Sequence, residues 1–301
     1  MIYAWVDAYL LYLESEKKYS ECTLNSYHSD LMQGIEFFSA KLKVSDLQLN
    51  PEQISLSLVR SFLADLRLRG LAKSSIARKI AAWRSFGNYL VRKKACSVNV
   101  FRELAPLKKG RKIPQYLYRK QCSRLLELPD TQKLVGIRDK AILELLYGSG
   151  LRIGELVGLD LKDLNFMQQE VRVWGKGSKE RIIPVGDYAL EALQFYCQKA
   201  RPQLLTSESG EALFLGVRGK RLAVRVARQI VYKYAQQLNL TKGISPHTLR
   251  HSFATHLLDG GADIRMVQEL LGHTNLSATQ IYTHLTEEKL KLIYSKSHPR
   301  A

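Results

Sequence analysis

Apolar residues recur at the spacing of amphipathic helices through the first ninety residues. Four segments share this pattern, and their apolar positions include Trp5, Tyr9 and Leu13, then Leu24, Tyr27 and Leu31, then residues within 57–68, then Ile76, Ile80, Trp83, Phe86 and Leu90. The expected boundary residues are Ser20 or Thr23 before the second helix, Gly70 after the third, and Ser74 or Ser75 before the fourth. Helices with one apolar face need partners, so residues 1–92 are predicted to form a four-helix bundle.

The pattern changes after residue 115, where helical periods alternate with short strand-like runs. Residues 139–147 read as a helix that stops at Gly148-Ser-Gly150, and Arg152 is expected in the first turn of the next helix. Alternating apolar residues on both sides of a glycine-rich turn predict a β-hairpin over 169–185, with Lys176 near its tip. Residues 187–240 read as further helices.

A well-delimited helix is predicted between Ser245 and Gly260. Ser245 is a good N-cap, Pro246 suits the first helical position, and the two glycines at 260–261 can end the helix. Leu249, Phe253 and Leu257 form its buried stripe, and His247 and Arg250 lie three residues apart on an adjacent face. Gly272-His273 is taken as the start of another helix, with Tyr282 nine residues later.

Two further segments complete the expected organisation. Residues 93–114 are rich in Lys, Arg, Gly and Pro, which favours an extended, solvated linker between a domain at 1–92 and a domain at 115–301. Near the end of the chain, Thr286 can cap a short helix on which Leu290, Ile293 and Tyr294 lie together.

Composition and charge limit the class of protein. The chain has 301 residues, 46% hydrophobic content and a formal net charge of +18, so it can hold two cored domains and favours a polyanionic partner. Nucleic acid is the commonest such partner, although ribosomal, heparin-like and anionic-membrane partners carry the same charge. Four scattered cysteines suggest neither a disulfide framework nor a zinc knuckle, and no apolar run is long enough to span a bilayer. We therefore expect a soluble cytoplasmic protein in a reducing compartment.

The positive charge is concentrated in one part of the chain. Residues 1–59 hold four basic and eight acidic residues, whereas residues 60–112 hold fifteen basic and two acidic residues. A balanced run would be an ordinary solvated face, but this local excess suits contact with DNA phosphates. The candidates for phosphate contact are Arg67, Arg69, Lys73, Arg78, Lys79 and Arg84.

Each candidate for chemistry also has a plainer interpretation. A single histidine or tyrosine near an apolar stripe is usually a packing residue. His247 and His251 have the spacing of zinc ligands on a helix, but the glutamate of the metalloprotease motif is missing and no obvious third ligand follows. The glycines around Lys176 lack the spacing of a nucleotide-binding P-loop. We therefore predict no metal and no cofactor.

Taken together, the motifs resemble the tyrosine recombinases, the site-specific DNA recombinases of the phage integrase family. His247-Thr-Leu-Arg250, Leu270-Leu-Gly-His273 and Tyr282 match the C-terminal box of that family. Gly-Ser-Gly-Leu-Arg152-Ile-Gly-Glu155-Leu matches the box that supplies its first catalytic arginine, and Lys176 matches its hairpin lysine. The segments beginning at Thr23 and Ser75 resemble its core-binding domain, although the Asn-Pro common in the family linker is here Asn-Val.

The resemblance implies a mainly α fold with a small β-hairpin or sheet in the C-terminal domain. It implies a two-domain clamp around double-stranded DNA, made of a helical, SAM-like core-binding domain and a catalytic domain. The implied catalytic residues are Arg152, Lys176, His247, Arg250, His273 and the nucleophile Tyr282. Lys179 and Arg181 are expected to touch phosphates or solvent. The implied reaction resembles that of type IB topoisomerases and passes through a 3′-phosphotyrosyl bond.

Within the family, the ending Tyr294-Ser-Lys-Ser-His-Pro-Arg-Ala301 is similar to the Xer recombinases, and Ile293-Tyr294 leans toward the XerC branch. Xer recombinases resolve chromosome dimers during segregation, so the implied partners are a dif-like site, a second related recombinase in a heterotetramer on two duplexes, and a cell-division regulator. The terminal helix is then expected to dock on a neighbouring subunit, the alternative being its own domain. An integrase of a mobile element, or a basic DNA-binding protein that does not cleave, also fits part of the pattern.

Overall fold

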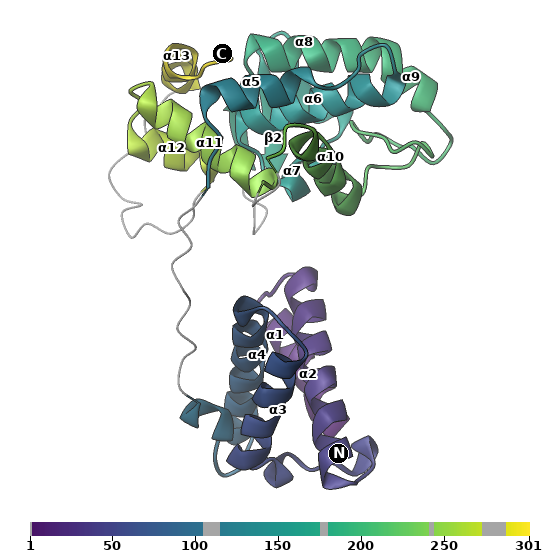
Figure 1. The fold of residues 1–301 in the computed structure, drawn as a ribbon, viewed down its shortest axis with the longest axis vertical. Helices are drawn as coiled ribbons and strands as arrows, with labels where there is room; N and C mark the ends of the chain where they lie inside the picture. Colours follow the sequence, from purple (N-terminus) through teal and green to yellow (C-terminus); the bar gives the residue numbers. More distant parts are fainter. Residues whose placement is uncertain (1, 105–114, 175–179, 241–243, 273–286) are drawn as a thin grey trace. The chain divides into compact units, whose positions relative to one another are not determined.

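The chain forms two compact units, Met1–Lys112 and Ile113–Ala301. The computed structural model describes residues 2–104, 115–174, 180–240, 244–272 and 287–301. Figure 1 labels the α-helices along the chain and strand β2. Among the helices of these described segments, none is both long and apolar enough to cross a membrane.

The N-terminal unit is a helical bundle, as the apolar periodicity predicted. Its helices are α1 (Ile2–Ser15), α2 (Glu21–Leu42), α3 (Leu56–Leu68) and α4 (Lys73–Arg92), with short 3-10 turns at Asp46–Gln48, Pro51–Gln53 and Val100–Glu103. The bundle buries an aromatic core in which Phe38 packs edge-on against Trp83, with ring centroids 5.2 Å apart. Ser20 precedes α2 as predicted. The predicted start of α4 at Ser74 or Ser75 is wrong, because helical hydrogen bonding already begins at the carbonyl of Ala72.

The first part of the predicted linker belongs to this bundle. Phe101 stacks on Trp83 with ring centroids 4.9 Å apart, and both side chains are buried. Asn99 donates a hydrogen bond to the carbonyl of Arg84, and Arg84 donates to the carbonyls of Phe101 and Leu104. The prediction of an extended, solvated linker is therefore wrong for residues 99–104, and residues 105–114 lie outside the described part of the chain.

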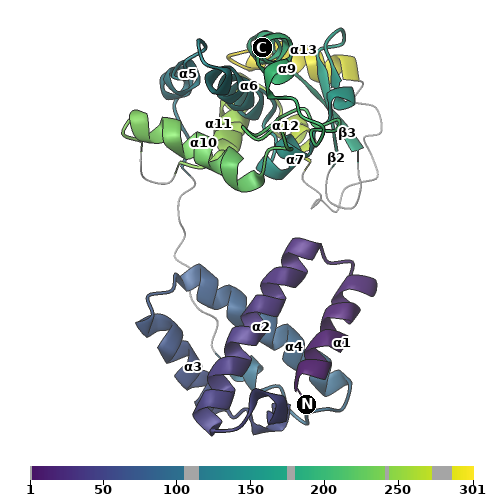
Figure 2. The same cartoon turned by 90° about the vertical axis from the view of Figure 1, so that its right-hand side faces the viewer.

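The C-terminal unit is mainly helical with one small sheet (Figure 2). Its α-helices are α5 (Arg119–Glu127), α6 (Leu134–Ser149), α7 (Ile153–Gly158), α8 (Asp187–Phe195), α9 (Arg201–Leu204), α10 (Val224–Gln237), α11 (Pro246–Asp259), α12 (Ile264–Leu271) and α13 (Glu287–Ser297). A 3-10 turn at Leu161–Asp163 precedes the sheet, and a π-helical turn at Tyr196–Ala200 links α8 to α9. Helix α6 is the central element, because nearly all its side chains are buried and α8, α11 and α5 pack against it.

The predicted hairpin is confirmed and gains a third strand. Strands β1 (Leu164–Asn165), β2 (Glu170–Trp174) and β3 (Glu180–Pro184) form an antiparallel sheet in the order β1-β2-β3. Val171 pairs with Ile183 and Val173 pairs with Arg181, so Arg181 shares a face with buried side chains. Lys176 and Lys179 fall between β2 and β3, outside the described residues.

Helix α13 lies against its own domain, where it contacts α11 and β3. Tyr294 is 3% exposed; its hydroxyl donates to the carbonyl of Gly148 at 2.8 Å and accepts from the N–H of Gly186 at 3.1 Å. Beyond the helix, Arg300 forms an ion pair with Glu144 at 2.7 Å. In this single chain the tail is held by a tyrosine with two buried backbone partners and by the Arg300–Glu144 ion pair. Docking of the terminal helix on a neighbouring subunit stays a prediction.

Candidate active site: three arginines around Glu155

A tight turn between α6 and α7 positions the first residues of the site. Helix α6 runs through Gly148, where the sequence pattern had ended it, and stops at Gly150. Gly150 has the left-handed backbone conformation, with φ of 59°, and a Cβ built there would lie 2.4 Å from the ring of Phe253. Glycine is therefore required at this position both for backbone geometry and for the close approach of α11.

Arg152 follows this turn as the N-cap of α7, and not within its first turn as predicted. The backbone N–H of Arg152 donates to Glu155 Oε2 at 2.8 Å, and its guanidinium contacts Glu155 Oε1 at 2.7 Å. A carboxylate three residues into a helix that reaches back to the capping residue is a capping box. The local sequence Arg-Ile-Gly-Glu therefore holds the first arginine by its backbone and its side chain together.

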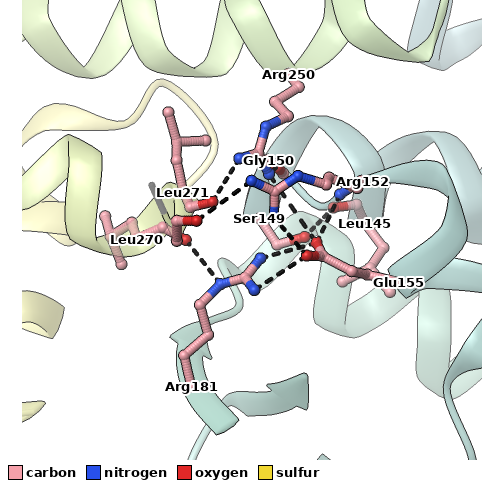
Figure 3. Close-up of polar contacts among 10 residues, drawn as sticks. Leu145, Ser149, Gly150, Arg152, Glu155, Arg181, Arg250, Leu270 and Leu271 are labelled. Atoms are coloured by element: carbon pink, nitrogen blue, oxygen red, sulfur yellow. Dashed lines mark hydrogen bonds and ion pairs between the residues drawn. The ribbon is translucent and has the colours of Figure 1, made fainter. Parts of the chain in front are cut away.

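Arg250 reaches the same place from α11. Its side chain is 9% exposed, and its Nη1 atom donates to the carbonyl of Gly150 at 2.6 Å and lies 4.0 Å from Glu155. Burial and the nearby positive charges of Arg152 and Arg181 together lower the pKa of Arg250 to about 10, against the opposing effect of Glu155. The group still carries its charge at neutral pH, so two fixed cations lie side by side (Figure 3).

Arg181 from β3 is the third arginine of the cluster. Its Nη1 and Nη2 atoms donate to the two carboxylate oxygens of Glu155, at 3.1 and 2.8 Å. Burial raises the pKa of Glu155, but the hydrogen bonds and charges of Arg181 and Arg152 outweigh that effect, and the net pKa is below its ordinary value. Glu155 is therefore a carboxylate among three guanidiniums.

Three carbonyls at the C-terminus of α12 complete the arrangement, and Figure 3 shows those of Leu270 and Leu271 beside the arginines. Arg181 donates to the carbonyl of Leu270 at 3.2 Å, Arg250 donates to that of Leu271, and Arg152 donates to that of Gly272 at 3.3 Å. The carbonyls at the C-terminus of a helix have no helical partners and carry partial negative charge, which suits cations. Each arginine thus binds one carbonyl at the end of α12.

Gly272 ends α12 with a left-handed φ of 63°. The sequence contained a signal for the end of this helix. The apolar pairs Met266-Val267 and Leu270-Leu271 follow the N-cap Asp263 at helical spacing, and Gly272 comes directly after the last pair. The helix predicted to start at Gly272-His273 would lie in residues outside the described part of the chain, so it stays a prediction.

The remaining predicted catalytic residues are only partly described. His247 is exposed on α11, one turn before Arg250, as the sequence predicted. The prediction of Ser245 as the N-cap is also confirmed, and its backbone N–H donates to Thr248 Oγ1 at 3.1 Å. Lys176, His273 and Tyr282 lie outside the described residues. The structure therefore brings together Arg152 and Arg250 from segments about 100 positions apart.

The candidates for phosphate contact in the N-terminal unit fall into two groups. Arg67, Arg69 and Lys73 are exposed near the α3–α4 turn, and Arg78 is partly exposed while paired with Asp30. Lys79 and Arg84 differ from the prediction. Lys79 is 5% exposed and donates to Asp30 at 2.8 Å, while Arg84 is held by backbone carbonyls. Their position within α4 turns both toward neighbouring elements of the bundle, so we revise them to structural residues.

Arg181 also differs from its predicted role at phosphates or in solvent, because its side chain is 14% exposed and faces Glu155. The signal that sequence reasoning missed was the alternation along β3, which places Arg181 on the same face as Ile183.

Two family models match the chain. The phage integrase family matches residues 115–289, and the phage integrase N-terminal SAM-like domain matches residues 6–94. Between them they cover most of both compact units.

Curated relatives match the chain over its whole length. It is 47% identical over 304 residues to tyrosine recombinase XerC of Pelotomaculum thermopropionicum, covering 100% of this chain and 99% of the relative. It is 40% identical over 296 residues to tyrosine recombinase XerD of Staphylococcus epidermidis, covering 98% of this chain and 99% of the relative.

Solved structures share the fold at lower identity. A lambda integrase (residues 75–356) dimer bound to a COC′ core site matches with a TM-score of 0.68 and 17% identity, covering 94% of this chain and 99% of that one. The Tn1549 transposon integrase in complex with circular intermediate DNA matches with a TM-score of 0.68 and 19% identity, covering 96% of this chain and 98% of that one. These likenesses concern the fold.

Proposed function

The chain belongs to the phage integrase family, and from that premise we propose how it works as a Xer-type tyrosine recombinase. It is a site-specific DNA recombinase, an enzyme that cuts and rejoins DNA strands through a tyrosine. The reaction class follows from the family; the roles of individual residues are our assignment.

One observation carries this assignment: the guanidiniums of Arg152 and Arg250 converge beside Glu155 at the C-terminus of α12. Attack on a phosphodiester adds negative charge to the non-bridging oxygens, and preorganised donors around those oxygens stabilise that charge. The planar fork of arginine suits this task better than the ammonium of lysine. His273, next in sequence after Gly272, is assigned as the third donor.

Tyr282 is assigned as the nucleophile. A tyrosine phenol has an ordinary pKa of about 10, so it needs a proton acceptor or a cationic environment to attack. We assign His247, exposed on α11 one turn from Arg250, as the base that takes this proton. A bond forms between the Tyr282 oxygen and phosphorus, the bond from phosphorus to the 5′ oxygen breaks, and Lys176 protonates the departing oxygen.

The product is a 3′-phosphotyrosyl bond and a free 5′-hydroxyl. Because the phosphodiester becomes another phosphodiester, a 5′-hydroxyl from a second duplex can reverse the step and complete strand exchange. The chemistry requires neither ATP nor a metal ion. Because the phosphotyrosyl bond retains the energy of the phosphodiester bond, one set of residues can both cut and rejoin the strand.

We propose double-stranded DNA as the partner, held by the exposed basic residues Arg67, Arg69 and Lys73 and by the site arginines. Following its relatives named XerC and XerD, we propose resolution of chromosome dimers during cell division, at a dif-like site in the cytoplasm. The further partners would be a related recombinase, in a heterotetramer on two duplexes, and a cell-division regulator.

The decisive experiment compares the wild type with Tyr282→Phe. Both proteins are incubated with randomised half-site duplexes that carry a nick near the cleavage position, so that a cut strand diffuses away and the covalent complex accumulates. Denaturing gels measure covalent DNA, and sequencing the trapped DNA identifies the site. The wild type should form the complex and Tyr282→Phe should not, while both bind DNA with similar affinity.

Tyr188→Phe is the matched control, because this exposed tyrosine on α8 has no role in the proposed chemistry. A covalent band that persists in Tyr282→Phe contradicts the assignment of the nucleophile. DNA binding by the wild type without any covalent product would instead favour a DNA-binding protein that does not cleave.

A further inference from the structure

We propose that Arg181 is a positioning residue of the recombination site, acting through Glu155 and the C-terminus of α12 on the catalytic arginines. This inference rests on the proposed function of Arg152 and Arg250 as phosphate-binding groups. It replaces the predicted contact of Arg181 with DNA phosphate.

The hydrogen bonds of Arg181 fix its guanidinium between two parts of the protein. Its Nη1 and Nη2 atoms donate to Glu155 at 3.1 and 2.8 Å, and its Nε atom donates to the carbonyl of Leu270 at 3.2 Å. All three nitrogens therefore have protein acceptors, which use three of the five N–H donors of the group, and the side chain is 14% exposed.

The partners of Arg181 are the groups that hold the catalytic arginines. Glu155 binds the backbone and the guanidinium of Arg152. The carbonyls that follow Leu270 bind Arg250 and Arg152. Arg181 thus fixes the carboxylate on one side of the arginine pair and the helix end on the other. A shift of either support would move the guanidiniums away from the reacting phosphate.

Arg181 is also close in sequence, or through its contacts, to Lys176 and His273, the other residues assigned to the reacting phosphate. Arg181 lies in β3, directly after the 175–179 segment that contains Lys176, and it touches the end of α12, directly before His273. The fit at the helix end is close, because a Cβ at Gly272 would lie 3.1 Å from the Arg181 guanidinium. One guanidinium therefore links the hairpin, α7 and α12.

Arginine is required for this arrangement by its shape. Its fixed fork can donate in parallel to both oxygens of a carboxylate while Nε donates in a third direction. A lysine ammonium carries the same charge but is a single point on a flexible stem, so it cannot span Glu155 and Leu270 in this geometry. Arg181→Lys therefore keeps the positive charge and removes the fork geometry, so it tests the two contributions separately.

The experiment measures single-turnover cleavage by the full-length protein on a nicked half-site duplex of the sequence that the wild type selects. Arg181→Gln and Arg181→Lys should lower the cleavage rate constant at saturating DNA on the order of 10²-fold, the usual effect of misplacing reacting groups by about 1 Å. The dissociation constant for DNA should stay within about twofold. The matched control is Arg172→Gln on β2, which is 54% exposed, pairs with Glu180 and should leave the rate unchanged.

A double-mutant cycle with Glu155→Gln tests whether Arg181 acts through that carboxylate. Arg181→Gln in the Glu155→Gln background should cost much less than in the wild type, because the shared support is already lost. Three results would overturn the inference: additive losses, weaker DNA binding at an unchanged saturated rate, or full activity of Arg181→Lys. If the wild type forms no covalent complex at all, the proposed function fails instead.

Should Arg181→Gln not fold, Arg181→Lys carries the same test, since it keeps the positive charge beside Glu155. Melting temperatures of all variants are measured to identify that case. A folded Arg181→Lys with a reduced saturated rate and unchanged affinity supports positioning.

Discussion

The Nη1 atom of Arg250 lies 2.6 Å from the carbonyl oxygen of Gly150, a residue 100 positions earlier in the chain. Gly150 has the left-handed conformation that ends α6, and its carbonyl points at the guanidinium only because the chain turns there. This contact joins the two halves of the proposed active site, since Arg152 follows the turn and Arg250 comes from α11. Both arginines are therefore sensitive to the same local geometry.

We expect Arg250→Lys to reduce covalent complex formation by roughly 10²–10³-fold at saturating DNA, because a lysine ammonium lacks the planar fork with which Arg250 spans the carbonyls of Gly150 and Leu271. DNA affinity should change much less. Single-turnover cleavage on the nicked half-site duplex measures the first quantity and a binding titration the second. Cleavage within a few fold of the wild type would mean that Arg250 does not stabilise the reacting phosphate.

Lys79→Met should destabilise the N-terminal bundle without altering the salt dependence of DNA binding. Lys79 and Asp30 form a buried ion pair at 2.8 Å, and breaking such a pair by removing one partner typically costs about 3 kcal/mol. The cost here should be smaller, because Asp30 keeps its ion pair with Arg78. Urea titrations of the full chain followed by circular dichroism measure this loss. An unchanged unfolding curve together with a flatter salt dependence would return Lys79 to the DNA-binding surface.

The triple variant Arg67→Gln, Arg69→Gln, Lys73→Gln should give the opposite pattern. These residues are exposed, and the ion pair of Arg69 with Asp65 at 3.5 Å lies at the surface, where such a pair contributes little, so their loss should leave stability nearly unchanged. Each phosphate contact contributes about 0.9 to the slope of log affinity against log salt concentration, so the slope should flatten by up to about 2.7. Affinities measured at several salt concentrations provide the slope. A slope equal to that of the wild type would place the DNA face elsewhere.

Acid should weaken the C-terminal unit through His298. Burial, together with the charges of His256, Arg300 and Arg119, lowers the pKa of His298 to about 3. The folded state then binds fewer protons than the unfolded state, so stability falls as the pH drops from above 6.5 toward 3. The full effect is up to roughly 5 kcal/mol.

Urea titrations between pH 7.5 and 5 measure this effect above the range in which carboxylates become protonated. His298→Phe keeps a ring that can stack on Tyr294, 5.1 Å away in the native protein, and should show a smaller loss of stability over this interval. Some pH dependence should remain, because burial also lowers the pKa of His256. An equal loss in both proteins would exclude His298 as its source.

Tyr294→Phe tests the attachment of the tail to its own domain. The substitution keeps the ring and removes the two hydrogen bonds with Gly148 and Gly186, at about 1 kcal/mol each, with a further cost for leaving those buried groups unpaired. Limited proteolysis should cut residues 287–301 faster in the variant than in the wild type. Equal cleavage rates would mean that these bonds do not hold the tail. Tyr232→Phe on α10, which is partly exposed, serves as the control.

The sequence determined what depends on short stretches of chain. The buried stripe of Leu249, Phe253 and Leu257 with Ser245 before it specified α11, and alternation on either side of a glycine-rich turn specified the β2–β3 hairpin. The motifs around Arg152 and Arg250 identified the family, because they combine residue types at fixed spacings. Periodicity and capping are local, so they can be read without knowing the fold.

Tertiary structure decided the roles that depend on partners far along the chain. Arg181 meets Glu155 across 26 positions and Leu270 across 89, and Phe101 enters the core beside Trp83 although its own segment is polar and basic. Charge alone had assigned Arg181 and Lys79 to DNA, because an arginine or lysine in a sequence carries no sign of a buried carboxylate opposite it. Only packing brings that carboxylate within hydrogen-bonding distance. The attachment of Tyr294 to Gly186 and to Gly148 in α6 has the same origin, since these two backbone partners lie 108 and 146 positions away.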